Sequence, residues 1–273
     1  MSGELDEPAW TALLSRLQSL GPVTVAYSGG IDSRFLAHAA LHADVSMELV
    51  HVCGPHVAPS ETDFALDWAK AQGLAVRLLR LDPLSLPQVA SGERERCYAC
   101  KSFLFRHIVA IARGRVCDGS NASDGAEFRP GRRALVELGI LSPLAEAGLT
   151  KDTLRSLAAR TGLSRPTQQS RACLLTRLPY GHLPDRDLLA RLAEGERVVE
   201  DALRAAGYAE HPFRLRVCEA GGYELHLGPA SPSTTVLRTL EEALHAAGFP
   251  CTPVRSMATV SGYFDNTDVL QDS

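Results

Sequence analysis

The stretch Val23-Thr24-Val25-Ala26-Tyr27-Ser28-Gly29-Gly30-Ile31-Asp32-Ser33 decides the fold class of this chain. Its first five residues form a short, largely β-branched and apolar run, which is typical of a buried strand. Glycines and small polar residues follow, and residues 35–43 then have helical character. A glycine-containing turn between a strand and a helix lies where an open α/β sheet binds its ligands.

Outward from this stretch, strands alternate with helices between residues 21 and 120. Because such alternation is typical of βαβ units, we predict an α/β fold whose parallel sheet carries helices on both faces. A loop is predicted over the polar, proline-containing residues 83–94. The elements are strands at 47–52, 76–81 and 115–117, and helices at 13–20, 60–73 and 102–113.

The pattern changes after residue 150, where we predict a domain boundary. Residues 1–150 form the α/β domain, and residues 151–273 form a smaller α+β domain. A proline-containing loop over residues 164–184 is long enough to indicate a functional segment. The second domain is predicted to contain helices at 150–161, 185–206 and 234–247, and strands at 213–217, 223–227 and 252–254.

The composition is that of an ordinary globular protein. The 273 residues are 45% hydrophobic and 22% charged, with a formal net charge of −4. That charge argues against a general nucleic-acid partner, and no apolar run has the roughly 18 residues that a membrane helix needs. The acidic start is unlike a secretory signal. We therefore expect a cytoplasmic protein, not bound to membranes, whose seven cysteines stay reduced.

Residues 28–33 predict a phosphate-binding loop. Gly29 and Gly30 allow the backbone to approach an anion, and the following helix directs its free N–H groups to the same place. Ser28 and Ser33 add hydroxyl groups, and the Asp32 carboxylate can hold Mg²⁺ beside phosphate oxygens. The simpler alternative is a glycine turn with a Ser/Asp helix cap, but the complete hexapeptide after an apolar strand favours the phosphate loop. It is not a Walker loop, because it lacks Gly-Lys-Ser/Thr.

Three of the cysteines are candidates for sulfur chemistry. Cys97 and Cys100 belong to Arg-Cys-Tyr-Ala-Cys-Lys, just before a predicted helix, and such a pair alone is compatible with redox chemistry, metal binding or coincidence. Cys173, in the long loop, could supply a third thiolate to a [4Fe–4S] cluster with one open iron. Alternatively, the Cys173 thiolate attacks a substrate itself, or the residue is a small buried hydrophobic one. The remaining cysteines are predicted to serve packing: Cys53, Cys117, Cys218 and Cys251.

The hexapeptide at 28–33 resembles the Ser-Gly-Gly-x-Asp-Ser loop of the PP-loop ATP pyrophosphatases. This resemblance implies a Rossmann-like sheet in the first domain and the use of ATP with Mg²⁺. In that superfamily a substrate oxygen attacks the α-phosphorus, pyrophosphate leaves, and the adenylated substrate reacts with a nitrogen or sulfur nucleophile.

A longer ordered set of stretches, within about residues 20–217, resembles the LarE family. These ATP-dependent enzymes insert sulfur during nickel-pincer cofactor synthesis. The resemblance implies a small anionic substrate, pyridinium-3,5-biscarboxylic acid mononucleotide, which becomes a thiocarboxylate. Family members tend to be homo-oligomers. The stretches that carry the resemblance are 96–101, 118–124, 128–131, 142–144, 172–177 and 178–181.

The LarE resemblance also implies roles for single residues. Cys173 matches the family's sulfur-bearing cysteine, followed by Thr176, where the family usually has Ser, and by Arg177. In one branch that cysteine is sacrificed and becomes dehydroalanine; in another, it holds a [4Fe–4S] cluster together with the Arg-Cys-Tyr-x-Cys pair. Because this chain has all three cysteines, it resembles the cluster branch. Glu200 matches a functional glutamate, and Arg214 and Arg216 match a phosphate-binding strand.

The residue types leave alternatives open for these positions. Two guanidiniums at period two point to one face of a strand and can bind a phosphate, but such a face can also simply be solvated. The polar residues after the strand at 115–117 could orient metal or substrate, or could serve as loop and helix caps. Those residues are Asp118, Asn121, Asp124 and, further on, Arg129.

One departure from the LarE pattern concerns residues 254–262, where the family's usual Asp is absent. The chain is therefore also compatible with a divergent family member that uses a different acceptor substrate. Other functions also remain: a tRNA-thiolating PP-loop enzyme, which the net charge of −4 disfavours; an ammonia-using amidating synthetase, for which the cysteines have no purpose; and a non-catalytic nucleotide-binding regulator, which binds ATP without releasing AMP.

Overall fold

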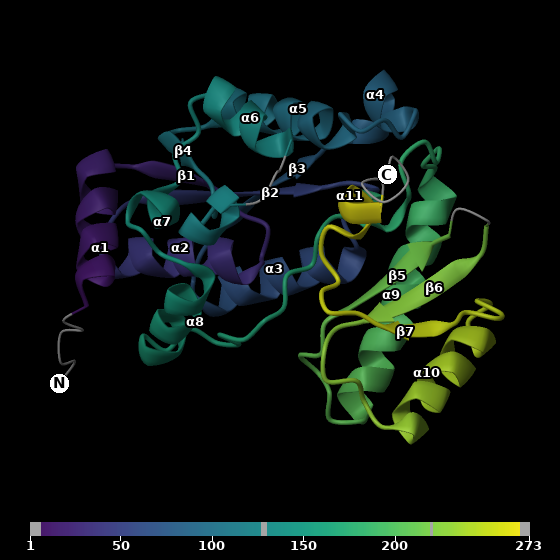
Figure 1. Cartoon of the computed structure of the whole chain (residues 1–273). Coiled ribbons are helices and arrows are strands. Elements are labelled where there is room, and N and C mark those ends of the chain that lie inside the picture. The colour runs from purple at the N-terminus through teal and green to yellow at the C-terminus, as the bar shows by residue number, and fades with distance from the viewer. Residues whose placement is uncertain (1–6, 127–129, 219–220, 268–273) are drawn as a thin grey trace. The chain divides into compact units, whose positions relative to one another are not determined.

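The computed structural model describes residues 7–126, 130–218 and 221–267, which divide into two compact units (Figure 1). Unit 1 comprises Met1–Gly54, Glu61–Pro83 and Glu95–Gln168. Unit 2 comprises Pro55–Ser60, Leu84–Arg94 and Gln169–Ser273. The domain boundary expected after residue 150 stays a prediction.

Unit 1 is built on a four-stranded, all-parallel sheet. Its strands are β1 (Val23–Ala26), β2 (Met47–Cys53), β3 (Val76–Arg80) and β4 (Arg115–Cys117), in the order β3-β2-β1-β4. The chain leaves β1 toward β2 on one side and later returns to β4 on the other. The carboxyl ends of β1 and β4 therefore lie side by side at the point where the strand order reverses, which is where open α/β sheets bind ligands.

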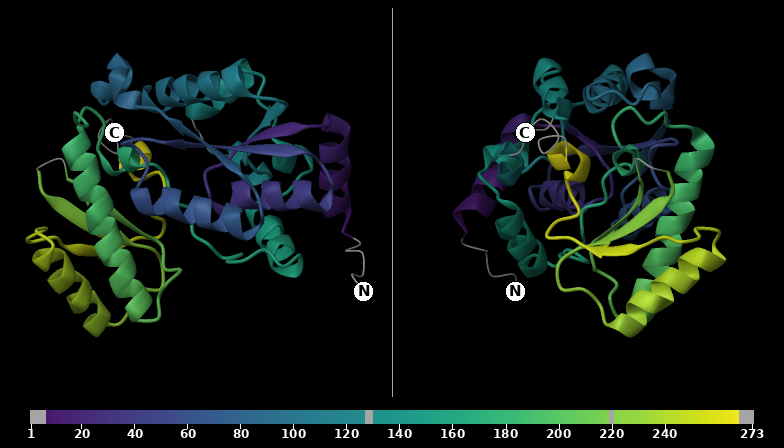
Figure 2. Two further views of the ribbon diagram at one scale, coloured as in Figure 1. Left: turned by 180° about the vertical axis from the view of Figure 1, so that it is seen from behind. Right: turned by 45° about the vertical axis from the view of Figure 1, so that its right-hand side comes forward.

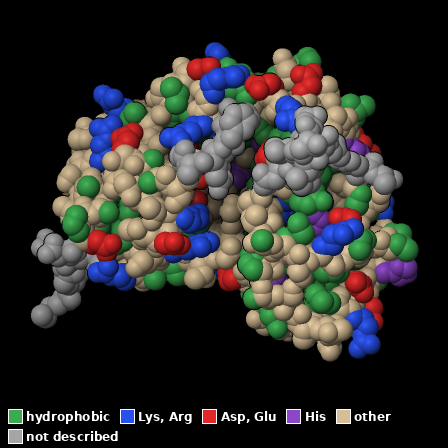
Figure 3. Space-filling model, viewed as in Figure 1, with side chains coloured by type: hydrophobic (Ala, Val, Ile, Leu, Met, Phe, Trp, Pro, Cys, Tyr) green, Lys and Arg blue, Asp and Glu red, His purple; other side chains and the backbone are tan. Residues whose placement is uncertain are grey.

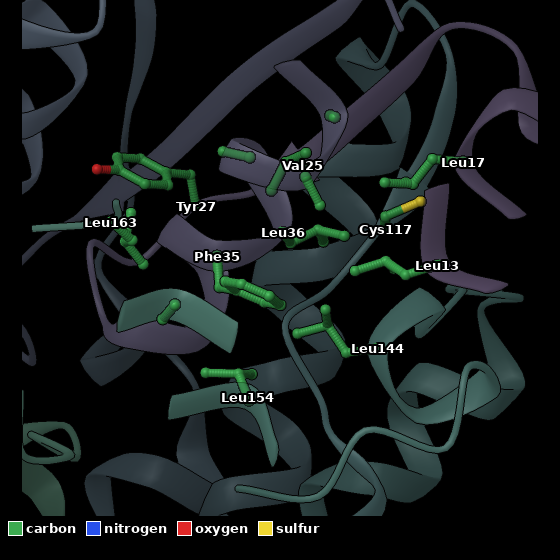
Figure 4. Packing of buried hydrophobic residues seen from close by; sticks show 14 of the residues in the cluster. Leu13, Leu17, Val25, Tyr27, Phe35, Leu36, Cys117, Leu144, Leu154 and Leu163 are labelled. Atoms are coloured by element: carbon green, nitrogen blue, oxygen red, sulfur yellow. The ribbon is translucent and has the colours of Figure 1, made fainter. Parts of the chain in front are cut away.

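Helices cover both faces of this sheet, as the alternation predicted (Figure 2). One face packs against α1 (Pro8–Leu20), α2 (Ile31–His42) and α3 (Pro59–Ala71), with α7 (Pro143–Glu146) and α8 (Lys151–Arg160) completing the same core. The other face packs against α5 (Arg96–Ile111) and α6 (Pro130–Glu137). Figure 4 shows the first core, where Phe35, Leu36, Leu144 and Leu154 meet beneath Val25. The predicted α/β fold is confirmed.

Local differences from the prediction have local causes. The helix expected from residue 102 begins at Arg96, so that Cys97 and Cys100 lie inside it rather than before it. The loop expected over residues 83–94 contains two short helices that begin at prolines, η1 (Pro83–Ser85) and α4 (Pro87–Ala90), because proline suits a first helical turn. Such short helices, like η2 (Ala122–Ala126), carry no apolar periodicity that a sequence could show.

Unit 2 is a smaller α+β structure, as expected. β5 (Phe213–Val217) pairs antiparallel with β6 (Tyr223–Leu227), and β6 pairs parallel with β7 (Val254–Ser256). The long helix α9 (Arg186–Ala205) packs against β5 and against α10 (Thr234–Ala246). The unit also contains the short helices η3 (Leu174–Arg177) and α11 (Tyr263–Thr267). η3 lies within the predicted long loop.

Two further observations concern the surface and the helices. Basic and acidic side chains are interspersed over the face drawn in Figure 3. Among the residues that the structure describes, no helix has the length and apolar character needed to cross a bilayer.

Candidate functional site

The segment 28–33 joins the end of β1 to the start of α2 as a compact loop. The Ser33 hydroxyl donates to the Gly30 carbonyl at 3.1 Å and accepts from the Ser28 amide at 3.2 Å. The Ser28 hydroxyl lies 3.2 Å from that of Ser33. The N-cap of α2 is Gly30, which has no side chain to cap the first amides of the helix. The loop is therefore shaped as an anion-binding helix start.

Glycine is required at position 29 for two reasons. Gly29 has a φ of 79°, which a side chain disfavours. A Cβ atom there would lie 2.6 Å from the Cβ of Ala65, on α3. The loop after β4 comes equally close, because a Cβ on Gly119 would lie 2.9 Å from the Ser33 amide. Gly29 therefore packs directly on α3, and Gly119 packs directly on the first turn of α2.

Arg34 stabilises the phosphate loop through hydrogen bonds from its buried guanidinium. Its side chain is fully buried, and its Nε–H donates to the Gly29 carbonyl at 3.1 Å. The other guanidinium nitrogens donate to the Ser164 carbonyl at 2.7 Å and to Oε1 of Gln168 at 2.5 Å. The guanidinium also lies over the Trp68 ring, 5.7 Å from its centroid. Arg34 thus ties the Gly29 peptide to the segment that follows α8.

Asp32 is held by residues from two later segments of unit 1. Nζ of Lys151 donates to both Asp32 carboxylate oxygens, at 2.6 and 2.7 Å. Nδ2 of Asn121 donates to Oδ1 of Asp32 at 3.3 Å. The Asp32 and Lys151 side chains are 26% and 23% exposed. The structure therefore brings together two predicted residues, Asp32 and Asn121, with a lysine that the sequence analysis did not single out.

The other predicted polar residues after β4 have bonds of their own. Asp118 is buried and accepts hydrogen bonds from the Ser120 and Ser142 hydroxyls at 2.5 and 2.7 Å. Oδ2 of Asp124 accepts from the Asn121 amide at 2.9 Å. These bonds agree with loop-stabilising roles, which were one of the two predictions for this segment. Arg129 lies outside the described residues.

Cys97 and Cys100 lie in the first turns of α5, three residues apart, so that they share one side of the helix. Cys100 is buried and Cys97 is half-buried. Tyr98 between them donates to Glu137 of α6 at 2.6 Å, and Arg133 stacks over the Tyr98 ring with its guanidinium carbon 3.7 Å from the centroid. α6 therefore steadies the turn that carries both thiols.

Cys173 lies in unit 2, at the N-cap of η3, and is half-buried. Its loop is held by Arg177, whose side chain is 1% exposed. Nη1 of Arg177 donates to the Ala172 carbonyl at 3.0 Å, and the Thr176 hydroxyl donates to the Cys173 carbonyl at 2.8 Å. Nε and Nη2, on the other edge of the Arg177 guanidinium, donate to the two carboxylate oxygens of Glu196 on α9, at 2.7 and 2.9 Å.

Arg214 and Arg216 on β5 serve the same loop. Both are buried, so the alternative of a solvated strand face is wrong. Arg214 donates to the Ser170 carbonyl, and Arg216 donates to the Thr176 carbonyl at 2.7 Å and to the Val260 carbonyl. These bonds fix the loop on either side of Cys173.

Glu200, on α9, pairs with two arginines. It accepts from Arg171 at 2.7 Å and from Arg204 at 2.8 Å. Arg171 belongs to the loop two residues before Cys173. The structure thus connects Glu200 to that loop through Arg171.

The surroundings of the Cys173 loop hold an excess of buried positive charge. Burial and the neighbouring charge of Arg177 lower the pKa of Arg214 to about 9 and that of Arg216 to about 10. Burial would raise the pKa of Glu196, but the charge and hydrogen bonds of Arg177 outweigh it and hold that pKa below its ordinary value. An anion bound here would offset the repulsion among the guanidiniums.

The four remaining cysteines differ from one another. Cys117 is fully buried in the first core, as predicted, and burial raises its pKa to about 12. Cys53 and Cys218 are half-buried. Cys251 is exposed, with a φ of 53°, so its prediction as a packing residue is wrong: the last turn beyond α10 carries it outward. Among the described residues, no three His, Cys, Asp or Glu side chains are grouped as ligands for a metal ion.

Comparison with known proteins decides the family. The chain is 30% identical over 204 residues to the pyridinium-3,5-bisthiocarboxylic acid mononucleotide synthase of Lactiplantibacillus plantarum, covering 72% of each chain. It belongs to the LarE family. Uncharacterized proteins of Synechocystis sp. and Methanocaldococcus jannaschii are also similar, at 31% and 28% identity over 189 residues. These matches cover 67% of this chain in both cases, and 69% and 71% of the relatives. No family model matches the chain.

Sequence reasoning missed three residues of this LarE-family chain: Arg34, Lys151 and Glu196. One of them left a signal in the sequence. Glu196 stands on the apolar face of α9, four residues after Leu192 and three before Val199. A charged residue on a buried helical face needs a partner. Arg34 follows Asp32 and Ser33 in the polar first turn of α2, where a charged residue is unremarkable. Lys151 follows a helix cap at Thr150, and nothing local points to its contact with Asp32.

Proposed function

We propose that this protein is an ATP-dependent sulfur transferase. A carboxylate oxygen of the substrate attacks the α-phosphorus of ATP, the bond to the β-phosphate oxygen breaks, and pyrophosphate leaves. Sulfur then attacks the acyl carbon of the adenylate, AMP departs, and a thiocarboxylate remains. The observation that carries the proposal is a Ser-Gly-Gly-Ile-Asp-Ser loop at the switch point of the sheet, in a chain of the LarE family.

The geometry of the loop supports ATP as the nucleotide. The uncapped start of α2 offers amide donors to phosphate. Mg²⁺, when bound, would neutralise part of the phosphate charge, and Asp32 and the hydroxyl of Ser33 are oxygen donors of the kind that it prefers. In this proposal Ser28 and Ser33 orient the phosphates through their hydroxyl groups.

The charges around the Cys173 loop support an anionic substrate. The relative from L. plantarum is named as a synthase of a pyridinium bisthiocarboxylic acid mononucleotide. We infer that this chain takes the corresponding mononucleotide. Arg214 and Arg216 attract its phosphate by their charge, while their nitrogens hold the carbonyls of the Cys173 loop. Glu200 acts here by orienting Arg171, and Arg177 acts by fixing the peptide of Cys173.

Two sulfur sources are compatible with these residues. In the first, the Cys173 thiolate attacks the acyl carbon; the Cβ–S bond then breaks with loss of the Cα proton, which leaves dehydroalanine and a thiocarboxylate. In the second, Cys97, Cys100 and Cys173 would hold a [4Fe–4S] cluster, which would supply an open iron for a hydrosulfide. The position of the Cys97 and Cys100 thiols on one side of α5 supports the cluster as the sulfur source.

Anaerobic incubation with ATP, Mg²⁺ and pyridinium-3,5-biscarboxylic acid mononucleotide tests the function. We expect AMP, pyrophosphate and a thiocarboxylate in equal amounts, detected by chromatography and mass spectrometry. If ATP is bound but no AMP is released, the protein is a nucleotide-binding regulator. If AMP appears only with ammonia and an amide forms, it is an amidating synthetase.

The sulfur source needs a separate measurement. Mass spectrometry of the protein after one turnover shows loss of H₂S at Cys173 if that cysteine is sacrificed. Anaerobically purified, brown protein that loses its iron in the Cys97→Ser, Cys100→Ser and Cys173→Ser variants supports the cluster. Cys251→Ser is the matched control, because Cys251 is exposed and lies outside both thiol groups.

A further inference from the structure

We infer that Lys151 is a phosphate ligand, which forms an ion pair with Asp32 beside the phosphate loop as long as no phosphate is bound. The inference rests on the proposed use of ATP at residues 28–33. It assigns Lys151 the task of moving from Asp32 to the polyphosphate when a nucleotide or pyrophosphate enters.

The backbone of Lys151 is firmly placed. Lys151 is the first residue of α8, and the Thr150 side chain caps that helix by accepting from the Thr153 amide. The Lys151 amide donates to the Ser123 hydroxyl at 3.0 Å, and the Ser123 amide donates to Oδ1 of Asn121 at 3.0 Å. The base of the lysine is thus tied to the loop that follows β4.

The tip of Lys151 is placed differently. Its ammonium lies 2.6 Å from Oδ2 of Asp32, and the pair is about one quarter exposed. A partly exposed ion pair of this kind adds little to stability and can exchange partners. The Asp118 carboxylate, by contrast, is buried and bonded by two hydroxyls. The pair Asp32–Lys151 is therefore the adjustable part of an otherwise fixed site.

The charge of Asp32 requires such a partner. Asp32 is the second residue of α2, and its carboxylate would repel phosphate at the helix start that is shaped to bind it. With Lys151 on Asp32 the two charges cancel. An entering polyphosphate adds negative charge that draws the ammonium, while a divalent cation can take its place on Asp32. Because a flexible four-carbon stem separates the Lys151 ammonium from its fixed Cα, the exchange needs only side-chain rotation.

Isothermal titration with inorganic pyrophosphate tests this assignment without needing the mononucleotide. We expect Lys151→Met to weaken pyrophosphate binding by about 10- to 100-fold, as for the loss of a hydrogen bond to a charged group. The chain has three lysines, Lys70, Lys101 and Lys151, and Lys70 is exposed on α3. Lys70→Met is therefore the matched control, and its affinity should equal that of the wild type.

A second pair of variants tests whether Lys151 contacts the phosphate itself or only neutralises the charge of Asp32. If Lys151 contacts phosphate, Asp32→Asn/Lys151→Met should bind Mg²⁺-free pyrophosphate more weakly than Asp32→Asn alone. Equal affinity of those two variants overturns the inference, as does a Lys151→Met protein that binds like the wild type. Wild-type protein that binds neither ATP nor pyrophosphate overturns the proposed use of ATP, and the Lys151 assignment with it.

NMR of the protein with carbon-13-methylated lysines gives an independent readout, because three lysines give few methyl signals to assign. The Lys151 signal, identified by its loss in Lys151→Met, should shift when Mg²⁺-free pyrophosphate is added, while the Lys70 signal stays in place. A Lys151 signal that does not move at saturating pyrophosphate contradicts the inference.

Discussion

Two loops of this protein carry the proposed chemistry, and they are held in opposite ways. The loop at 28–33 in unit 1 is shaped by backbone geometry at Gly29 and by hydrogen bonds of the Ser28 and Ser33 hydroxyls. The loop around Cys173 in unit 2 is held by long guanidinium side chains that are buried beneath it, above all Arg177.

The difference follows from what each loop must leave open. A loop that binds phosphate needs free N–H groups. The serine hydroxyls accept only from the Ser28 and Gly30 amides, and no side chain caps the first amides of α2. A loop that presents one thiol has no such constraint, but its irregular backbone leaves carbonyl oxygens that need donors. Buried arginines supply several donors each, at the cost of needing a carboxylate such as Glu196 for charge balance.

The largest expected effect comes from removing that carboxylate. Glu196→Ala leaves the buried Arg177 without its partner and should lower the free energy of unfolding of unit 2 by about 3–5 kcal/mol. Urea denaturation followed by far-UV circular dichroism measures the loss, and fluorescence reports unit 1 separately, because Trp10 and Trp68 both lie there. Glu194→Ala, at an exposed position of the same helix, is the control and should change little. Equal effects of the two variants would mean that the buried pair does not support the Cys173 loop.

Gly29→Ala should be the most damaging change in the first loop. The left-handed φ and the 2.6 Å approach to Ala65 together should cost about 2–4 kcal/mol, combining backbone strain and overpacking. Gly73 also has a positive φ, of 69°, but has open space around it. Gly73→Ala should therefore cost only about 1–2 kcal/mol, the share due to strain. Tryptophan fluorescence during denaturation measures both, and a Gly29→Ala loss no larger than that of Gly73→Ala would refute the close packing of this loop.

Acid should weaken both loops in part through a buried histidine that contacts each of them. His51 bonds the Tyr27 carbonyl just before the first loop, and His226 accepts from Nε of Arg216, which holds the second. Burial lowers the pKa of both histidines. The unfolded chain therefore binds more protons, so stability is complete above about pH 6.5 and falls as the pH drops, by up to about 1.4 kcal/mol per pH unit for each.

His51→Gln should reduce the pH dependence seen by tryptophan fluorescence, and His226→Gln should reduce the part seen only by circular dichroism. The remainder belongs to His38 in unit 1 and His211 in unit 2, because burial lowers the pKa of His38 to about 4 and also lowers that of His211. His245→Gln, at an exposed position of α10, is the control. A pH dependence between 7 and 5 that neither substitution reduces would assign the acid sensitivity to other groups.

The smallest expected effect on stability belongs to the Asp32–Lys151 pair. Because both side chains are about one quarter exposed, Lys151→Met should cost less than about 1 kcal/mol of unfolding free energy in unit 1. A loss as large as that of Glu196→Ala would show that the first loop also depends on a structural ion pair. Together with the pyrophosphate titration, this measurement separates a binding role from a structural one.

Much of the fold could be predicted from local pattern. The strands at Val76–Arg80, Arg115–Cys117 and Phe213–Val217 lie where apolar runs predicted them, because strand periodicity repeats within a few residues. The caps of α8 and α9, Thr150 and Asp185, are likewise local signals. Helices such as α4 and α7 were missed, since four residues show no period.

The site was predictable only in its local parts. The hexapeptide at 28–33 predicted a phosphate loop, and the two-residue spacing of Arg214 and Arg216 predicted that both lie on one face of a strand. Their burial was not predictable, because it depends on which segments pack above β5. The same holds for Cys251, whose exposure follows from the turn after α10.

By itself, the sequence determined the order of strands and helices, the phosphate loop and the family resemblance, since all three rest on residues that are neighbours in the chain. Only the tertiary structure decided that Lys151 meets Asp32 across 119 residues, and that Arg177 faces Glu196 rather than solvent. The physical reason is that a charge accepts any partner of opposite sign, so the choice among them is made by packing. Strand order and helix register bring one pair within hydrogen-bonding distance and exclude the rest.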